Sequence, residues 1–224
     1  MTNGWKGEVR LRVDAEAMTL YAVTDRTWAK DITLMEQVRQ ALEGGITFLQ
    51  LREKHLSENE FVKEAKEMKQ LAAKYQIPFV INDNIKVALE VDADGVHIGQ
   101  DDMSVQKARK ILGEGKIIGV SAHNVKEAVK AQEEGADYLG VGAVCTTSTK
   151  KDANVVSKEE IRRISDTVDI PIVAIGGIKK ENIQTLEGTG ADGVAVVSAI
   201  FASKDIKEDT KELLRLVKEM KQNK

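Results

Sequence analysis

The stretch PIVAIGGIKKENIQTLEGTGADGVAVVSAI, residues 171–200, contains one complete strand–helix–strand unit. Its two short runs, 172–175 and 193–197, are almost wholly apolar, which is typical of parallel strands covered on both faces. Residues 179–187 between them are predicted to form a helix. Glycine at the end of that helix tolerates positive φ and allows the chain to turn into the second strand.

The same unit recurs along the rest of the chain. Four helix-to-strand junctions share glycine, a small residue and often an acid: EGG (43–45), DADG (92–95), EGAD (134–137) and TGADG (189–193). This likeness predicts a repeated βα unit. Strands are expected at 19–24, 47–51, 79–82, 95–98, 117–120, 138–141, 172–175 and 193–197. Helices are expected at 34–43, 57–74, 84–90, 104–112, 124–134, 157–167, 179–187 and 206–222.

Eight such units in 224 residues predict an α/β fold, a single (β/α)₈ TIM barrel. The main alternative is an open doubly wound sheet, which normally has fewer strands. No linker or break in composition divides the chain, so residues 1–224 are expected to form one domain. Residues 1–18 are expected to be a short N-terminal extension.

Composition narrows the class of protein. The net charge is −3 and aromatic residues make up only 4 %, so the chain has neither the basic field nor the stacking surfaces of a nucleic-acid-binding protein. The charged N-terminus has no apolar run suited to a signal peptide or a membrane span. The single cysteine, Cys145, forms no internal disulfide. We therefore expect a cytoplasmic enzyme without nucleic-acid or membrane partners; a homo-oligomer is compatible with this interpretation.

Polar side chains gather where the predicted strands end, which is where TIM barrels carry their active sites. At the end of the second strand, alternation places Gln50, Arg52 and Lys54 on one side. Arginine offers forked donors and lysine a point charge, so this set predicts a clamp for a diphosphate. The alternative is a solvated, salt-bridged loop.

Two carboxylates follow adjacent strands. Asp83 ends the third strand and Asp102 follows the fourth, with Asn82 and Gln100 nearby. Hard oxygen ligands of this kind predict Mg²⁺ held by few protein groups and by substrate phosphates. No His/Cys spacing suggests zinc. The alternative is a helix N-cap by Asp102 or Ser104.

A phosphate site is predicted between the last two strands. In such barrels the loops after the seventh and eighth strands often bind phosphate through backbone N–H groups and a helix N-terminus, and here they carry Gly176-Gly177 and Val197-Ser198. The hydroxyl-rich run TTSTKK (146–151) can wrap a phosphate as well, or it can be a simple turn.

The histidines have different expected roles. His123 follows Ser121 on the predicted active face and can transfer protons, or it can be a structural hydrogen-bond partner. His97, inside the fourth strand, and His55 are expected to be structural. Cys145 is interpreted as a small residue that fills space at a strand end.

Together these segments resemble the thiamine-phosphate synthase family. The matching runs, which cover residues 19–200 in order, are LYAVTD (20–25), QLREK (50–54), INDN (81–84), ADGVHIGQDD (93–102), GVSAH (119–123), ADYLGVG (136–142), TTSTKKD (146–152), PIVAIGGI (171–178) and GADGVAVVSAI (190–200). One departure lies at Ala143, Cys145 and Thr146, where many members carry a proline, an aromatic residue and a second proline.

The resemblance implies a specific reaction. The family joins 4-amino-2-methyl-5-hydroxymethylpyrimidine diphosphate to 4-methyl-5-(2-phosphoethyl)-thiazole with Mg²⁺, and releases pyrophosphate. The residues that match its pyrimidine-diphosphate contacts are Gln50, Arg52, Lys54, Asn82, Ser121 and Lys150. Of these, Arg52, Lys54, Ser121 and Lys150 are assigned to catalysis. Asp83 and Asp102 match the metal ligands, and the thiazole-phosphate site is matched by Thr147, Thr149, Gly177, Val197 and Ser198.

Other functions compete with this interpretation. A thiazole tautomerase would use a histidine such as His123, but it needs no diphosphate clamp and no carboxylate pair. A non-catalytic thiazole-phosphate binder or regulator would need only the site after the last two strands. A sugar-phosphate epimerase is disfavoured because the carboxylates lie beside a cationic clamp.

Overall fold

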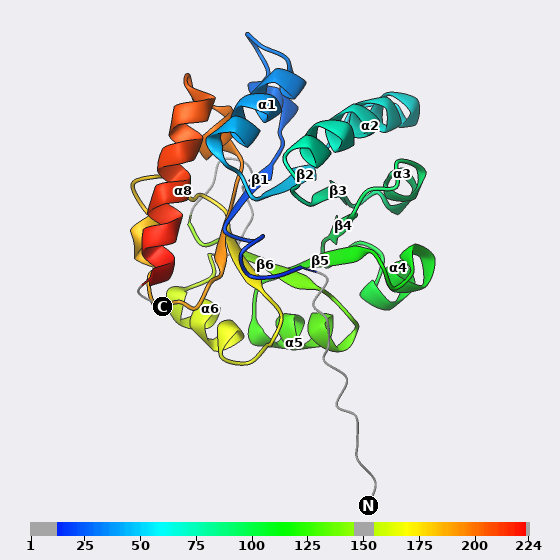
Figure 1. The fold of residues 1–224 in the computed structure, drawn as a ribbon. Helices are drawn as coiled ribbons and strands as arrows, with labels where there is room; N and C mark the ends of the chain where they lie inside the picture. Colours follow the sequence, from blue (N-terminus) through cyan, green and yellow to red (C-terminus); the bar gives the residue numbers. More distant parts are fainter. Residues whose placement is uncertain (1–12, 146–154, 223–224) are drawn as a thin grey trace, which may run out of the picture.

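A computed structural model of the protein describes residues 13–145 and 155–222. Eight parallel strands close into a barrel in sequence order, because β1 pairs with both β2 and β8. Figure 1 shows the helices as a ring around these strands, and the predicted TIM barrel is confirmed. The strands are β1 (Leu20–Val23), β2 (Phe48–Leu51), β3 (Phe79–Asn82), β4 (Gly95–Ile98), β5 (Ile117–Ala122), β6 (Tyr138–Gly142), β7 (Ile172–Ile175) and β8 (Gly193–Val196).

Most helices lie where the periodicity predicts them. They are α1 (Leu34–Gly44), α2 (Glu58–Lys74), α3 (Ile85–Glu90), α4 (Val105–Leu112), α5 (Val125–Glu133), α6 (Lys158–Ser165), α7 (Ser198–Phe201) and α8 (Ile206–Gln222), with 3₁₀ turns η1 (Arg26–Trp28) and η2 (Ile183–Leu186). The helix predicted at 179–187 is wrong, since only η2 forms there. The Asn182 side chain accepts the Lys179 N–H at 2.7 Å and donates to the Gly177 carbonyl at 2.9 Å, so the chain forms a turn around this amide.

The barrel has two apolar layers. One lies between strands and helices, and the other fills the inside of the barrel with side chains that include Tyr21, Phe48 and Tyr138. Val13 and Met18 are buried against this inner layer, so residues 13–18 cover the amino-terminal end of the barrel. Residues 1–12 of the expected extension lie outside the described residues.

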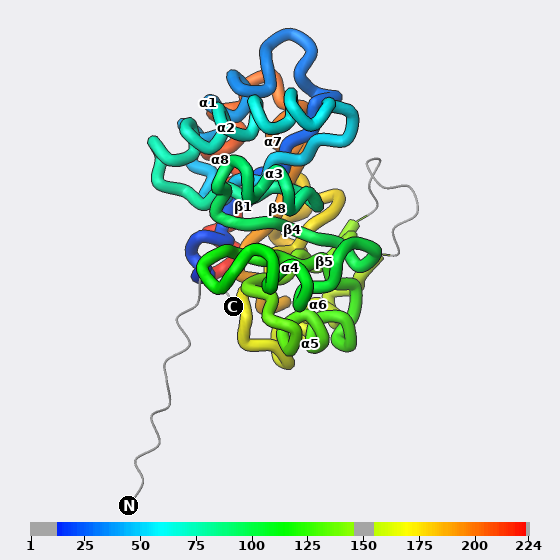
Figure 2. Tube along the Cα trace, turned by 90° about the vertical axis from the view of Figure 1, so that its right-hand side faces the viewer, coloured from blue at the N-terminus to red at the C-terminus, as the bar shows by residue number. Residues whose placement is uncertain are grey.

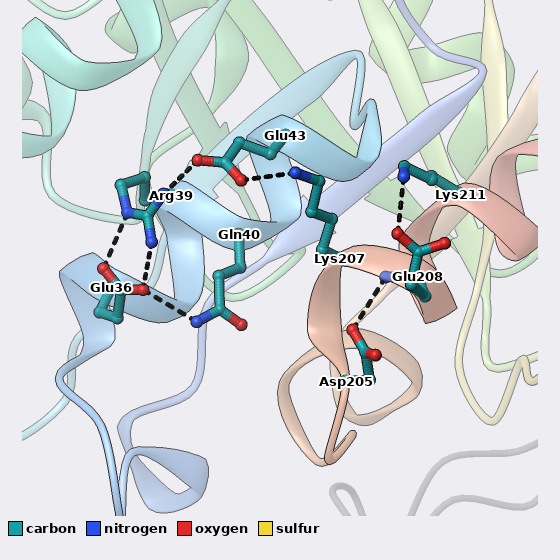
Figure 3. A network of polar contacts seen from close by, with 8 residues as sticks. All are labelled: Glu36, Arg39, Gln40, Glu43, Asp205, Lys207, Glu208 and Lys211. Carbon is teal, nitrogen blue, oxygen red and sulfur yellow. Dashed lines mark hydrogen bonds and ion pairs between the residues drawn. The ribbon is translucent and has the colours of Figure 1, made fainter.

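The first and last long helices pack side by side and close the outer ring. Lys207 of α8 contacts Glu43 of α1 at 3.0 Å, beside the Glu36–Arg39 ion pair of α1 (Figure 3). Exposed ion pairs contribute only about 0–1 kcal/mol each, so buried side chains such as Leu213 provide most of this contact.

The two ends of the described chain lie at one end of the molecule. Lys221, near the end of α8, donates to the Thr19 hydroxyl at 2.7 Å, and Figure 2 shows the dark blue start of the chain beside the C-terminus. Within 13–145 and 155–222, no helix is both long and apolar enough to cross a membrane.

The amino-terminal end of the barrel is fixed by a repeated pair of hydrogen bonds, which we call the junction pair. The Leu20 N–H donates to the Thr47 hydroxyl at 2.8 Å, and the Thr47 N–H donates to the Leu20 carbonyl at 2.8 Å. The same two bonds join Asp94 to Phe79, Asp137 to Ile118 and Asp192 to Ile172. Each pair therefore links the start of an odd-numbered strand to the residue that precedes the next strand, at the junctions whose likeness predicted the repeat.

Replacing Thr47 with valine tests the junction pair. Valine keeps the shape of the side chain but leaves the Leu20 N–H without its acceptor, so the free energy of unfolding should fall by about 1–3 kcal/mol. The control is Thr167→Val, which removes an exposed hydroxyl that donates to the Arg163 carbonyl and should change stability by less than about 0.5 kcal/mol. Urea unfolding measures both, and equal effects would contradict the assignment.

Candidate active site

Most of the predicted site residues meet in one cavity at the carboxyl ends of the strands. This inner cavity is lined by Gln50, Arg52, Asn82, Ser121, Gly177, Val197 and Ser198, among others. A more open outer pocket shares Asn82 with it and adds Lys54 and Asp83. Thr147, Thr149 and Lys150 lie outside the described residues, so their roles remain predictions.

The end of β2 is held against β1 by a buried threonine. The Arg52 N–H donates to the Thr24 hydroxyl at 2.9 Å, and the Thr24 N–H donates to the Gln50 carbonyl at 3.0 Å. Thr24 has no exposed surface. The main chain on either side of Leu51 is therefore fixed, and the Gln50 and Arg52 side chains enter the inner cavity.

The predicted alternation holds for Gln50 and Arg52, which line the inner cavity, but Lys54 lines the outer pocket together with Glu53, because β2 ends at Leu51. Both Glu53 oxygens accept from Arg26 Nε, at 3.1 and 3.2 Å, and Arg26 also contacts Glu64 at 2.6 Å. Arg26 thus neutralises Glu53, while Arg52 lines the cavity. The clamp of Gln50, Arg52 and Lys54 stays a prediction.

Asp83 and Asp102 face each other at the rim. Partial withdrawal from water and the nearby Asp102 carboxylate raise the pKa of Asp83 to about 6, against the opposing effects of Asn82 and Arg52. Asp102 accepts the Gly99 N–H at 2.7 Å, and Ser104 makes no side-chain cap on α4. Of the two N-cap candidates, Ser104 does occupy the N-cap position of α4, without a side-chain bond, whereas the Asp102 side chain bonds to Gly99 instead.

This acid pair suits a divalent cation, because two crowded carboxylates supply hard oxygen ligands and a repulsion that a cation would relieve. In the described part of the chain, no three His, Cys, Asp or Glu side chains gather into a larger metal cluster. A cation here would thus complete its shell with water or substrate oxygens, which is how proteins usually hold Mg²⁺.

The loop after β7 has a backbone that requires glycine. Gly176 and Gly177 have φ of 100° and 69°, and a Cβ on Gly176 would lie 2.6 Å from that of Ala143. Asn182 holds the Gly177 carbonyl, and Ser198 begins α7 directly after β8. These two loops line one side of the inner cavity, as the predicted phosphate site requires.

A chain of hydrogen bonds across the barrel interior was missed by sequence reasoning. Gln50 Nε2 donates to the Tyr21 hydroxyl at 2.5 Å, and that hydroxyl lies 2.8 Å from the hydroxyl of Tyr138. The Tyr138 hydroxyl lies 3.0 Å from His97 Nδ1, and His97 Nε2 lies 3.0 Å from Ser121 Oγ. We call these five residues the interior chain. It connects two predicted substrate contacts, Gln50 and Ser121, through three residues that were not assigned to the site.

His123 also lines the inner cavity, and its side chain is engaged. Its Nδ1 lies 2.8 Å from Glu127 Oε2, and the same oxygen accepts its backbone N–H at 2.9 Å. Glu127 is in the first turn of α5. The ring therefore has a structural partner, while proton transfer by His123 stays a prediction.

Comparisons with known proteins agree with these observations. Residues 20–200 match the family model described as thiamine monophosphate synthase. A thiamine-phosphate synthase from Clostridium acetobutylicum is 48 % identical over 89 % of this chain and 94 % of its own, and one from Clostridium tetani is 50 % identical over 87 % and 93 %. Among solved structures, a thiamine phosphate pyrophosphorylase from Pyrococcus furiosus is 41 % identical in sequence and superimposes with a TM-score of 0.85, over 92 % of this chain and 98 % of that one.

Asp83→Asn tests the repulsion within the acid pair. The raised pKa means that the folded state holds this proton more tightly than the unfolded state, so wild-type stability should fall as pH rises from about 4 to about 6. Asparagine keeps the shape, tolerates the φ of 60° at this position and removes the charge. At pH 8 without metal it should raise the free energy of unfolding by at most about 1 kcal/mol, because water screens these groups.

Chemical denaturation in a chelator at pH 8 and at pH 4 measures this effect. The gain should vanish at pH 4, where wild-type Asp83 is also neutral. The matched control is Asp101→Asn, a neighbouring exposed carboxylate that should give no such pH dependence. A loss of stability in Asp83→Asn at pH 8 would contradict the repulsion.

Proposed function

The chain belongs to the thiamine monophosphate synthase family, and from this premise we propose the reaction and the residue roles that follow. The protein is a transferase. It joins 4-amino-2-methyl-5-hydroxymethylpyrimidine diphosphate to 4-methyl-5-(2-phosphoethyl)-thiazole and forms thiamine monophosphate and pyrophosphate. One observation carries the proposal: a single cavity has a cationic, amide-bearing side and a separate glycine-rich side.

The two sides suit two anionic substrates. Arg52, with Lys54 at the adjoining rim, faces the diphosphate, while Gln50, Asn82 and Ser121 contact the pyrimidine side. Gly177, Val197 and Ser198 hold the thiazole phosphate at the opposite wall through backbone N–H groups and a hydroxyl. Both reactants then lie in one cavity, which replaces a random encounter by a fixed one.

The chemistry proceeds without an enzyme nucleophile. The bond between the pyrimidine methylene carbon and the diphosphate oxygen breaks, and the electron pair leaves with pyrophosphate. The amino-pyrimidine delocalises the resulting cation, and the thiazole nitrogen supplies the electron pair of the new carbon–nitrogen bond. Arg52 and Lys54 stabilise the charge that develops on the leaving group, and Lys150 is assigned the same role from the family motif.

Asp83 and Asp102 would hold the Mg²⁺ ion. A bound ion supplies further charge neutralisation for the leaving diphosphate. Asn82 lines both the inner cavity and the outer pocket, so it lies where the pyrimidine and diphosphate portions of one substrate would meet.

The decisive experiment is pyrophosphate release by the purified protein with both substrates and Mg²⁺, with each component omitted in turn. Release should require all three and should match thiamine monophosphate in amount. Asp102→Asn should lower kcat and raise the Mg²⁺ concentration for half-maximal rate by at least about tenfold, because one charged ligand is lost. Asp101→Asn serves again as the control.

The omissions also separate the alternatives. Tight binding of thiazole phosphate without turnover would contradict the synthase and favour the binder or the tautomerase, with His123 as the residue to test. Unchanged Mg²⁺ dependence in both Asp83→Asn and Asp102→Asn would remove the metal assignment while leaving the reaction in place.

Ser198→Ala and Arg52→Lys test the two sides of the cavity against each other. Loss of the Ser198 hydroxyl should raise the KM for thiazole phosphate about tenfold, since one hydrogen bond to a charged group is worth about 1.5–3 kcal/mol. Arg52→Lys keeps the charge but loses the fork, and should act on the pyrimidine diphosphate. Steady-state kinetics with each substrate varied measure both effects. If Ser198→Ala instead impaired use of the pyrimidine diphosphate and Arg52→Lys impaired use of thiazole phosphate, the two sides would be assigned the wrong way round.

A further inference from the structure

The interior chain has a direction, which is set at Gln50. The amide nitrogen of Gln50 can only donate, so the Tyr21 oxygen accepts. Each tyrosine has one hydroxyl hydrogen. Distance alone leaves the donor open in the bond between the two tyrosines. Among the described residues the Tyr21 hydroxyl contacts Gln50 and Tyr138 alone, so its hydrogen has Tyr138 as acceptor. Within the same part of the chain the Tyr138 hydroxyl contacts Tyr21 and His97 Nδ1 alone, so its own hydrogen goes to that nitrogen. A nitrogen that accepts carries no hydrogen, so the neutral imidazole bears its proton on Nε2 and donates it to Ser121 Oγ.

We propose that the interior chain fixes His97 as the neutral Nε2–H tautomer and reserves the hydroxyl hydrogen of Ser121 for an acceptor on the substrate. Ser121 receives a hydrogen bond from His97 and lines the inner cavity with Gln50. Its carbonyl is held by Gln100 Nε2 at 2.6 Å, which fixes the main chain from which the hydroxyl projects. Tyr21, Tyr138 and His97 are thus positioning residues that act through Gln50 and Ser121.

The surrounding packing leaves the chain little freedom. Tyr21 and Tyr138 are fully buried, and burial raises the pKa of both, so their hydroxyls stay protonated. A Cβ on Gly119 would lie 2.1 Å from Cζ of Tyr138, and a Cβ on Gly140 would lie 3.1 Å from Cε1 of His97. Glycines on β5 and β6 therefore provide the space that the two rings occupy.

The direction of the chain matters for the reaction, and this step rests on the proposed function. A neutral His97 delivers a donor to the cavity without a positive charge. A positively charged imidazolium would repel a cation that forms on the pyrimidine, because in the interior chain only Ser121 separates His97 from the substrate. The neutral imidazole avoids this repulsion. Ser121 can donate to a pyrimidine ring nitrogen or to a phosphate oxygen, since both are acceptors.

The tautomer can be measured directly on the full chain without substrates. Two-bond ¹H–¹⁵N correlation spectra of the ¹⁵N-labelled protein near pH 7.5 distinguish Nε2–H, Nδ1–H and imidazolium forms. Only three histidines are present, and His55→Gln and His123→Gln remove the other two signals. We expect protonated Nε2 and unprotonated Nδ1 at His97. An Nδ1–H tautomer or an imidazolium would overturn the proposal, whatever the outcome of the turnover assay.

Tyr138→Phe tests the functional consequence, because it removes the hydroxyl and keeps the ring. Without the Tyr138 hydroxyl, the spectra of His97 should show a mixture of the two neutral tautomers. The kcat/KM for the pyrimidine diphosphate should fall about tenfold, which is the loss expected for one misdirected hydrogen bond. The KM for thiazole phosphate should change by less than about twofold. Tyr75→Phe, at the exposed end of α2, is the matched control and should leave all values unchanged.

Tyr21→Phe provides a second variant that breaks the chain one step earlier. It should affect the same kinetic parameter. If Tyr138→Phe and Tyr21→Phe lower only thermal stability and leave both the tautomer and the pyrimidine-diphosphate kinetics unchanged, the chain is structural and the positioning role is wrong.

Discussion

The four junction pairs at the amino-terminal end of the barrel fix the register between neighbouring strands. The candidate site at the opposite end of the barrel depends on that register. Thr47, Asp94, Asp137 and Asp192 each exchange two hydrogen bonds with one residue near the start of the preceding strand. These short bonds leave one register for each pair of strands. A shift by one residue would turn every inward side chain outward, so Gln50 and Ser121 would face the helices instead of the cavity.

That register also decides what fills the barrel. Tyr21, Phe48 and Tyr138 pack within the inner layer, with ring centroids 4.6 to 5.9 Å apart, and Gly119 on β5 makes room for the Tyr138 ring. Buried tyrosine hydroxyls need partners, and here both hydroxyls belong to a chain whose two ends, Gln50 and Ser121, line the inner cavity. The inner core and the candidate active site are therefore continuous, and a change in packing deep in the barrel reaches Gln50 and Ser121, the predicted substrate contacts.

Periodicity and junction chemistry were enough to predict the fold, because both are local: β3, β4 and β7 begin and end at the predicted residues. The alternation likewise predicted that Gln50 and Arg52 enter the cavity, but it was wrong for Lys54, which follows the end of β2 and lines the outer pocket. The interior chain could not be predicted in this way. Tyr21 and Tyr138 are 117 residues apart, and their contact depends on strand register across the barrel. The false helix at 179–187 has a different, local origin, since one side chain, Asn182, bonds to the backbone of residues 177 and 179 and holds a turn there.

The polar groups of the site differ in charge according to depth. Asp83 and Asp102 lie at the rim, where water screens their repulsion and a cation can reach them. The amide and hydroxyl groups of the interior chain are neutral, and His97 is neutral in the proposed tautomer, so the chain brings no positive charge to the deeper part of the cavity. Arg52, between the two regions, contributes the positive charge. In the proposed reaction, a neutral carbon–oxygen bond divides into a cation and an anion. This order would stabilise the anion toward the rim and leave the deeper cavity free of competing positive charge.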